Sequence, residues 1–120
     1  MSVAFRRSAL LLAPALAAAV AVPSAAQTLA SDAKCLIVSN VFAQSSDPKA
    51  KQAGIEARYF YLGRLTGSTA QIETALAAQG KTITKQNAGP TMQACARTVV
   101  QKANEVQAIG QRLSSRPAGR

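Results

Sequence analysis

The chain has 120 residues, which is the length of one small domain. It contains fourteen lysines and arginines, five acidic residues and no histidine, so its net charge at pH 7 is +9. Without histidine the commonest general base near neutral pH is missing, and no Ser-His-Asp or Cys-His catalytic set can form. There is also no glycine-rich phosphate loop and no EF-hand loop. We therefore expect a protein that is not an enzyme and that holds no metal or cofactor.

Residues 1–26 have the three-part layout of a secretory signal peptide. Two arginines precede an uncharged, apolar run over residues 8–22, and small residues stand at 24–26. A retained membrane anchor is the alternative. The run is short for a span of about 20 residues, and Pro14 and Pro23 interrupt it. We expect cleavage after Ala26 and a mature protein that is periplasmic or secreted and not integral to the membrane.

The mature chain, residues 27–120, contains two cysteines, Cys35 and Cys95. An even number of cysteines in an exported protein indicates a disulfide bond. Free or catalytic thiols and metal binding are the alternatives, but there is no Cys-x-x-Cys redox motif, and a zinc site would need further cysteines or a histidine. In the chain-entropy model, closing a loop of about 60 residues stabilises the fold by about 4 kcal/mol.

The first predicted helix covers residues 31–44, with Ser31 or Thr28 as its N-cap. Its apolar residues cover one broad side, which includes Cys35 and the core residue Phe42. The run CLIVSNVF also suits a β-strand, because isoleucine and valine favour strands. No second strand of similar strength exists to pair with it, so we expect a helix.

A second helix is predicted from Pro48, with Asp47 as N-cap, to about residue 65, where a glycine at position 67 ends it. At 100° per residue this helix has two apolar sides. Phe60 and Tyr61 lie on the side rich in alanine and are predicted to be core. The opposite side carries a candidate interface, made up of Ile55, Tyr59 and Leu62. That side is either buried against a neighbouring helix or a surface for self-association or a protein partner, where tyrosine is favoured. We expect Tyr59 to be more exposed than Phe60 and Tyr61. Gly63 would let a neighbouring helix approach closely at that level.

Two further helices complete the chain. A capping box at Ser68 and Gln71 predicts a third helix to about residue 79. Pro90 begins the fourth, whose apolar face places Cys95, Val99 and Val106 in the core. The sequence thus predicts an all-α, four-helix domain over residues 27–114, cross-linked by one disulfide between the first and last helices, with a disordered tail at 115–120.

The mature chain keeps twelve basic and five acidic side chains, a net charge of +7. The basic residues are dispersed, with no run of four, and export argues against a nucleic-acid partner. They are interpreted as a solvated surface, with weak attraction to an anionic envelope surface as the alternative.

The leader, a cysteine near the start of the first helix and a second one in MQACARTV resemble the layout of HdeA-type periplasmic acid-stress chaperones. The segment YLGRLTG is similar to the Tyr-Leu-x-Gly segments of small disulfide-bonded periplasmic immunity proteins of the Rap/Tai kind. These resemblances imply a small, two-cysteine helical periplasmic protein of Gram-negative bacteria. An acid-driven switch would have little to act on, because the chain has five acids and no histidine.

The function predicted from the sequence is a non-enzymatic periplasmic protein-interaction module, chaperone-like, immunity-like or a subunit of an envelope assembly. The alternative is a basic envelope-surface binder of anionic lipid or polymer.

Overall fold

The structure, a computed structural model, describes residues 24–119. These residues form four helices: α1 (Ala25–Phe42), α2 (Pro48–Arg64), α3 (Thr69–Gly80) and α4 (Ala88–Ser114). Residues 24–119 contain no strand, and Cys35 is bonded to Cys95. The predicted all-α, four-helix domain with one disulfide is confirmed, and the alternative of a strand near Cys35 is wrong.

The start of α1 differs from the prediction. The helix begins at Ala25 and not at residue 31, because Ser24 and Gln27 form a capping box. The Ser24 hydroxyl accepts from the Gln27 backbone N–H at 3.2 Å, and the Gln27 side chain accepts from the Ser24 N–H at 3.0 Å. The predicted cleavage after Ala26 falls in this first turn. The rest of the predicted signal peptide, residues 1–23, lies outside the described residues.

The other helix starts follow local signals. Asp47 accepts from the Ala50 N–H at 2.9 Å and caps α2, and Ser68 with Gln71 caps α3. Between them Gly67 has a φ of +124°, a backbone conformation that side chains disfavour. The last helix begins at Ala88, two residues before the predicted Pro90, after a turn in which the side chains of Thr84 and Asn87 accept from each other's backbone N–H groups.

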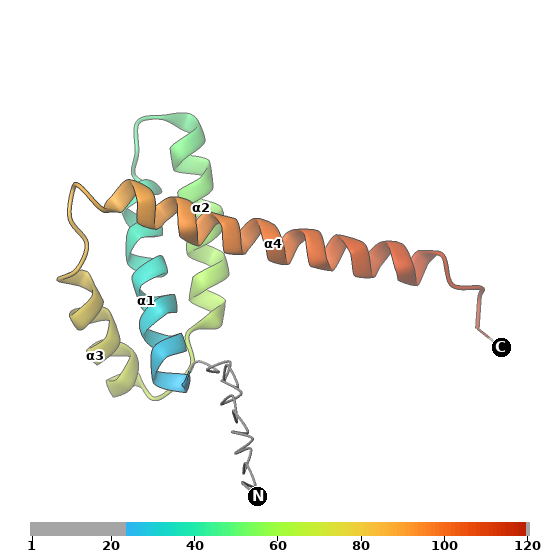
Figure 1. The fold of residues 1–120 in the computed structure, drawn as a ribbon, viewed down its shortest axis with the longest axis horizontal. Coiled ribbons are helices and arrows are strands. Elements are labelled where there is room, and N and C mark those ends of the chain that lie inside the picture. Colours follow the sequence, from blue (N-terminus) through green and yellow to red (C-terminus); the bar gives the residue numbers. More distant parts are fainter. Residues whose placement is uncertain (1–23, 120) are drawn as a thin grey trace, which may run out of the picture.

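Figure 1 shows how the helices are arranged. The central helix, α1, lies between α2, which runs antiparallel to it, and α3. The fourth helix crosses α1 and α2, and its second half extends away from them. No close backbone contact joins α3 to α2 or α4 within the described chain. The molecule is therefore a small body with one long helix projecting from it.

The core lies where α4 crosses α1 and α2. It consists of Cys35, Val38, Ala57, Tyr61, Met92 and Cys95. Three predicted core residues, Phe42, Phe60 and Val99, are half-buried against this cluster. At the α1–α2 crossing the backbones approach closely at Gly54, not at Gly63, which has no neighbour within 4 Å of an added Cβ.

The core prediction is wrong for Val106, whose side chain is 60% exposed. It shares a helix face with Cys95 and Val99, but α4 has left the body by that point, and every residue from 100 to 119 is exposed. The helical wheel identified the apolar face correctly, but none of the helices within residues 24–119 covers it at this point.

Candidate interaction surface

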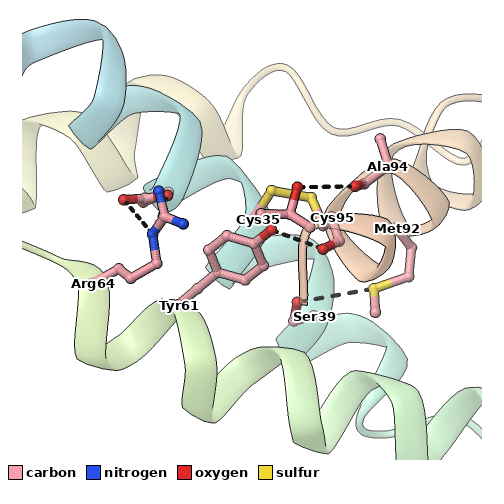
Figure 2. Close-up of a disulfide and its surroundings, with 9 residues drawn as sticks. Cys35, Ser39, Tyr61, Arg64, Met92, Ala94 and Cys95 are labelled. Carbon is pink, nitrogen blue, oxygen red and sulfur yellow. Dashed lines mark hydrogen bonds and ion pairs between the residues drawn. A yellow bond between two sulfur atoms is a disulfide. The ribbon is translucent and has the colours of Figure 1, made fainter. Parts of the chain in front are cut away.

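The disulfide joins the first and last helices at the centre of the core. The Cα atoms of Cys35 and Cys95 are 5.6 Å apart, and 60 positions separate them in the sequence. Figure 2 shows Tyr61 reaching from α2 toward this bond, where its hydroxyl donates to the Cys95 carbonyl at 2.8 Å. Nearby, the fully buried Ser39 hydroxyl contacts the Met92 sulfur at 3.9 Å. These contacts tie three helices together, and no described cysteine is a free thiol.

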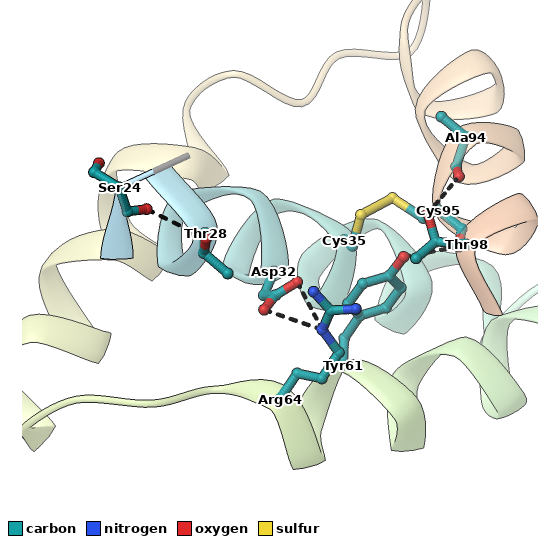
Figure 3. A network of polar contacts seen from close by, with 9 residues as sticks. All are labelled: Ser24, Thr28, Asp32, Cys35, Tyr61, Arg64, Ala94, Cys95 and Thr98. Atoms are coloured by element: carbon teal, nitrogen blue, oxygen red, sulfur yellow. Dashed lines mark hydrogen bonds and ion pairs between the residues drawn. A yellow bond between two sulfur atoms is a disulfide. The ribbon is translucent and has the colours of Figure 1, made fainter. Parts of the chain in front are cut away.

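An ion pair lies beside the disulfide. The Arg64 Nε is 3.2 Å from each carboxylate oxygen of Asp32, whose residue is only 3% exposed (Figure 3). The Arg64 guanidinium also lies over the rings of Phe60, at 5.3 Å, and Tyr61, at 5.9 Å. The pair therefore holds the end of α2 against α1, and the buried carboxylate has its charge compensated.

An open depression of about 550 Å³ is lined by this ion pair and the disulfide. Burial raises the pKa of Tyr61, and the Thr98 hydroxyl and the Arg64 guanidinium offset this only in part. The phenol is therefore neutral at physiological pH and serves as a hydrogen-bond donor. Within residues 24–119, no three His, Cys, Asp or Glu side chains are placed to hold a metal ion. The depression is lined by this ion pair, the closed disulfide and several hydroxyl side chains, and we assign no reaction to it.

A second, larger hollow of about 760 Å³ lies between α1 and α3. It is open, and alanine, threonine and glutamine make up most of its lining together with Leu29. Its α1 wall includes Ala25 and Ala26, which the predicted cleavage removes from the mature chain. We assign no ligand to this hollow.

The sequence-predicted interface follows one side of α2. Tyr59 is 63% exposed and Leu62 is 56% exposed, whereas Ile55 is partly buried. The Arg58 guanidinium covers one face of the Tyr59 ring at 5.3 Å. On the other side of the helix Tyr61 is 2% exposed and contacts Phe60 edge-to-face. Tyr59 is thus the most exposed of the three aromatic residues, and two large side chains of this stripe face solvent.

A larger apolar surface, which the sequence reasoning assigned to the core, lies on the projecting part of α4. We call residues 100–114 the arm. One face of the arm continues the core-facing side of α4, and we call this face the α4 stripe; it consists of Ala103, Val106, Gly110 and Leu113 and follows the partly buried Val99. Val100 and Ile109 flank it, and both are exposed. The signal that could have revealed this surface was the length of α4, which is too great for the small body it crosses.

No helix among the described residues is long and apolar enough to span a membrane. No protein-family model matches the chain, and no curated protein or solved structure matches it significantly. The resemblances to HdeA-type chaperones and to Rap/Tai-type immunity proteins therefore stay predictions from the sequence. The candidate surface rests on the geometry of α2 and α4 alone.

Proposed function

We propose that this chain is a non-enzymatic protein-interaction module that works in the periplasm after an N-terminal signal peptide is removed. The leader pattern of residues 1–26 supports export. The disulfide between Cys35 and Cys95 fits an oxidising compartment, because such bonds persist outside the cytosol.

The observation that carries this proposal is the uncovered α4 stripe. Val106 and Leu113 are more than half exposed on an arm that projects from the body. A contiguous apolar face of this kind costs solubility unless another surface covers it, and such faces mark interaction sites. No described residue covers the arm, so a helix of another polypeptide can lie along it by the helix-in-groove mode.

A basic envelope-surface binder is the second candidate. Four basic side chains lie on or next to the arm: Arg97, Lys102, Arg112 and Arg116. An amphipathic helix with basic residues can bind an anionic surface, and such binding weakens steeply with salt. The two candidates therefore differ in their response to an added positive charge and to ionic strength.

A matched pair of substitutions separates them. Val106→Lys places a charge in the stripe, and Gln101→Lys places the same charge on the opposite, polar face. Lysine is a good helix former and both sites are exposed, so both variants are expected to keep the fold. We expect the immobilised wild-type chain and Gln101→Lys to capture one partner from periplasmic extract at physiological salt, and Val106→Lys to lose it. Tyr59→Lys tests the candidate interface on α2, which consists of Ile55, Tyr59 and Leu62, in the same assay.

Vesicles rich in anionic lipid provide the opposing test. Strong vesicle binding that Gln101→Lys increases, and that collapses between low and physiological salt, would replace the proposal with the surface-binder reading. Capture that is identical for Val106→Lys and Gln101→Lys would show that the stripe does not bind the partner.

A further inference from the structure

The Arg64 guanidinium uses only part of its hydrogen-bonding capacity. Its Nε donates to the Asp32 carboxylate at 3.2 Å, and no other hydrogen bond joins this side chain to residues 24–119. A guanidinium carries five N–H donors, so those on its two terminal nitrogens are available. Arg64 lines the open depression of about 550 Å³ between α1, α2 and α4, and its side chain is 38% exposed there.

The position of this guanidinium is fixed by the protein itself. The buried Asp32 carboxylate holds its Nε, and the guanidinium lies over the rings of Phe60, at 5.3 Å, and Tyr61, at 5.9 Å. Figure 3 shows it next to the Asp32 carboxylate and the Tyr61 ring. A charged group that is already oriented loses little conformational entropy when a ligand binds, so the site is preorganised.

A second cation lies in the wall of the same depression. Lys34, on α1, is half-buried and forms no ion pair with a residue that the structure describes. Lys34, Arg64 and Asp32 are the charged residues of the lining, and two positive charges with one negative charge give a net charge of +1. The depression therefore suits a single negative charge. A phosphate group carries about −1.5 to −2 at pH 7 and would leave excess negative charge beside Asp32.

We propose that this depression binds a carboxylate group, which the terminal nitrogens of Arg64 contact in a bidentate manner. The planar fork of a guanidinium matches the two oxygens of a carboxylate. The inference goes beyond the proposed function, because it concerns a different surface from the α4 stripe and does not depend on it. Two sources present this group: a small organic acid and the C-terminus of a protein.

The rest of the lining suits a short, uncharged body attached to the carboxylate. Pro90, Ala94 and the disulfide supply apolar surface, and Thr91 and Thr98 contribute side chains that carry a hydroxyl. A methyl group next to the carboxylate would contact apolar atoms, and an amide would find polar partners. N-acetylalanine combines these features and is a suitable probe.

N-acetylalanine and N-acetylalaninamide are a matched pair, since they differ only in the carboxylate, which is ionised at pH 7. Titration of the isotope-labelled, oxidised protein, followed by two-dimensional NMR, measures both. For the acid we expect a dissociation constant of about 1–10 mM, because the contact is small and open. Its shifts should concentrate in residues 31–35, 61–64 and 90–98, and the amide should give no saturable shift. Equal binding of the two probes, no saturable binding of the acid, or tighter binding of inorganic phosphate overturns the inference.

Three variants locate the site. Arg64→Lys keeps a positive charge beside Asp32 but removes the planar fork, so we expect it to weaken binding of the acid by about tenfold or more. Lys34→Gln leaves the ion pair of Arg64 intact and should weaken binding by about threefold. Lys51→Gln removes a charge from the exposed start of α2, about 20 Å along the helix axis from Arg64, and should leave the affinity unchanged.

Circular dichroism confirms that the variants are helical. An affinity that stays unchanged in both Arg64→Lys and Lys34→Gln overturns the assignment of the site. An equal loss in all three variants also overturns it, because the overall positive charge of the protein would then attract the probe.

A longer probe distinguishes the two sources of the carboxylate. The acetylated tripeptide of alanine, with a free C-terminus, presents the same group after two further residues. Binding about tenfold tighter than that of N-acetylalanine would identify the C-terminus of a protein as the source, because the added residues then make contacts of their own. Equal affinity would identify a small organic acid. Both results support the carboxylate site, and the Val106→Lys experiment tests the proposed function separately.

Discussion

Gly54 lies where the backbones of α1 and α2 cross most closely, and Gly54→Ala is the sharpest test of the fold. A Cβ at this position would lie 2.6 Å from the Phe42 carbonyl carbon and 2.8 Å from the Ser39 carbonyl oxygen, and closer still to the Ala43 nitrogen. Ordinary carbon contacts lie at about 3.5–4.0 Å. All three neighbours are backbone atoms, so no rotamer change relieves the overlap, and α1 must move away from α2 by about 1 Å.

The expected magnitude follows from two opposing effects. Replacing glycine by alanine inside a helix normally stabilises it by about 1 kcal/mol. Overpacking costs about 1–3 kcal/mol, and more where the backbone has to move. Because the overlap here is with backbone, we expect a net loss of about 3 kcal/mol. A domain of this size has a free energy of unfolding of about 5–13 kcal/mol, so the loss is a large share. It corresponds to a fall in melting temperature of about 12–24 °C.

Gly63→Ala, in the same helix, is the matched control. No atom lies within 4 Å of a Cβ added there, so the change should be neutral or stabilise the protein by up to about 1 kcal/mol. Urea denaturation of the oxidised protein, followed by circular dichroism, measures both variants. If Gly54→Ala unfolds at the same urea concentration as Gly63→Ala, the two backbones are not in contact and the α1–α2 crossing described here is incorrect.

Three further experiments test the core junction. Replacing Cys35 and Cys95 together by serine is expected to lower the free energy of unfolding by about 4 kcal/mol in urea; equal midpoints would mean that the bond adds nothing to stability. Arg64→Met should lower the free energy of unfolding more than Asp32→Asn. The first variant leaves the buried Asp32 carboxylate without a compensating charge, whereas in the second the Arg64 side chain can turn into water. A larger loss in Asp32→Asn would contradict this reasoning. Burial raises the pKa of Tyr61 above its usual value of about 10, so the neutral phenol stabilises the folded state fully below about pH 10. This stabilisation is lost as the pH rises through the raised pKa of the folded state. Melting temperatures measured from about pH 8 to about pH 12 should fall less in Tyr61→Phe than in the wild type. Identical pH profiles of the two proteins would refute this prediction.

Features that depend on neighbouring residues in the sequence were predictable. Asp47 with Pro48 and the Ser68–Gln71 capping box start their helices as expected, because a cap is a contact within four residues. The cysteine pairing was predictable for a different reason, since two cysteines in a chain that is predicted to be exported leave a single intramolecular option. The start of α1 was missed because Ser24 was interpreted as part of the cleavage site, and the same residues also form a capping box with Gln27.

Features that depend on which other helix packs against a given helix face were not predictable. Phe60 and Val106 both lie on apolar faces, but one is half-buried and the other is exposed. The difference arises from the crossing of α4 over α1 and α2, which brings its first half onto the core and carries its second half past it. Gly54 and Gly63 differ in the same way. Both lack a side chain, and only the position at which α1 crosses α2 determines that the backbone of α1 approaches Gly54.

The arm is also a helical segment that packs against no other described helix. An isolated helix of about 15 residues is marginal in water, because forming the first turn fixes several dihedral angles for one hydrogen bond. In α4 this nucleation cost is met by the first half, where Met92 and Cys95 are buried, so the arm only has to extend an existing helix. Extension alone adds little stability per residue, and the gain from covering Val106 and Leu113 would come on top of it. A binding partner therefore acts on the arm twice, by removing apolar surface from water and by holding the helix in the conformation that presents the stripe.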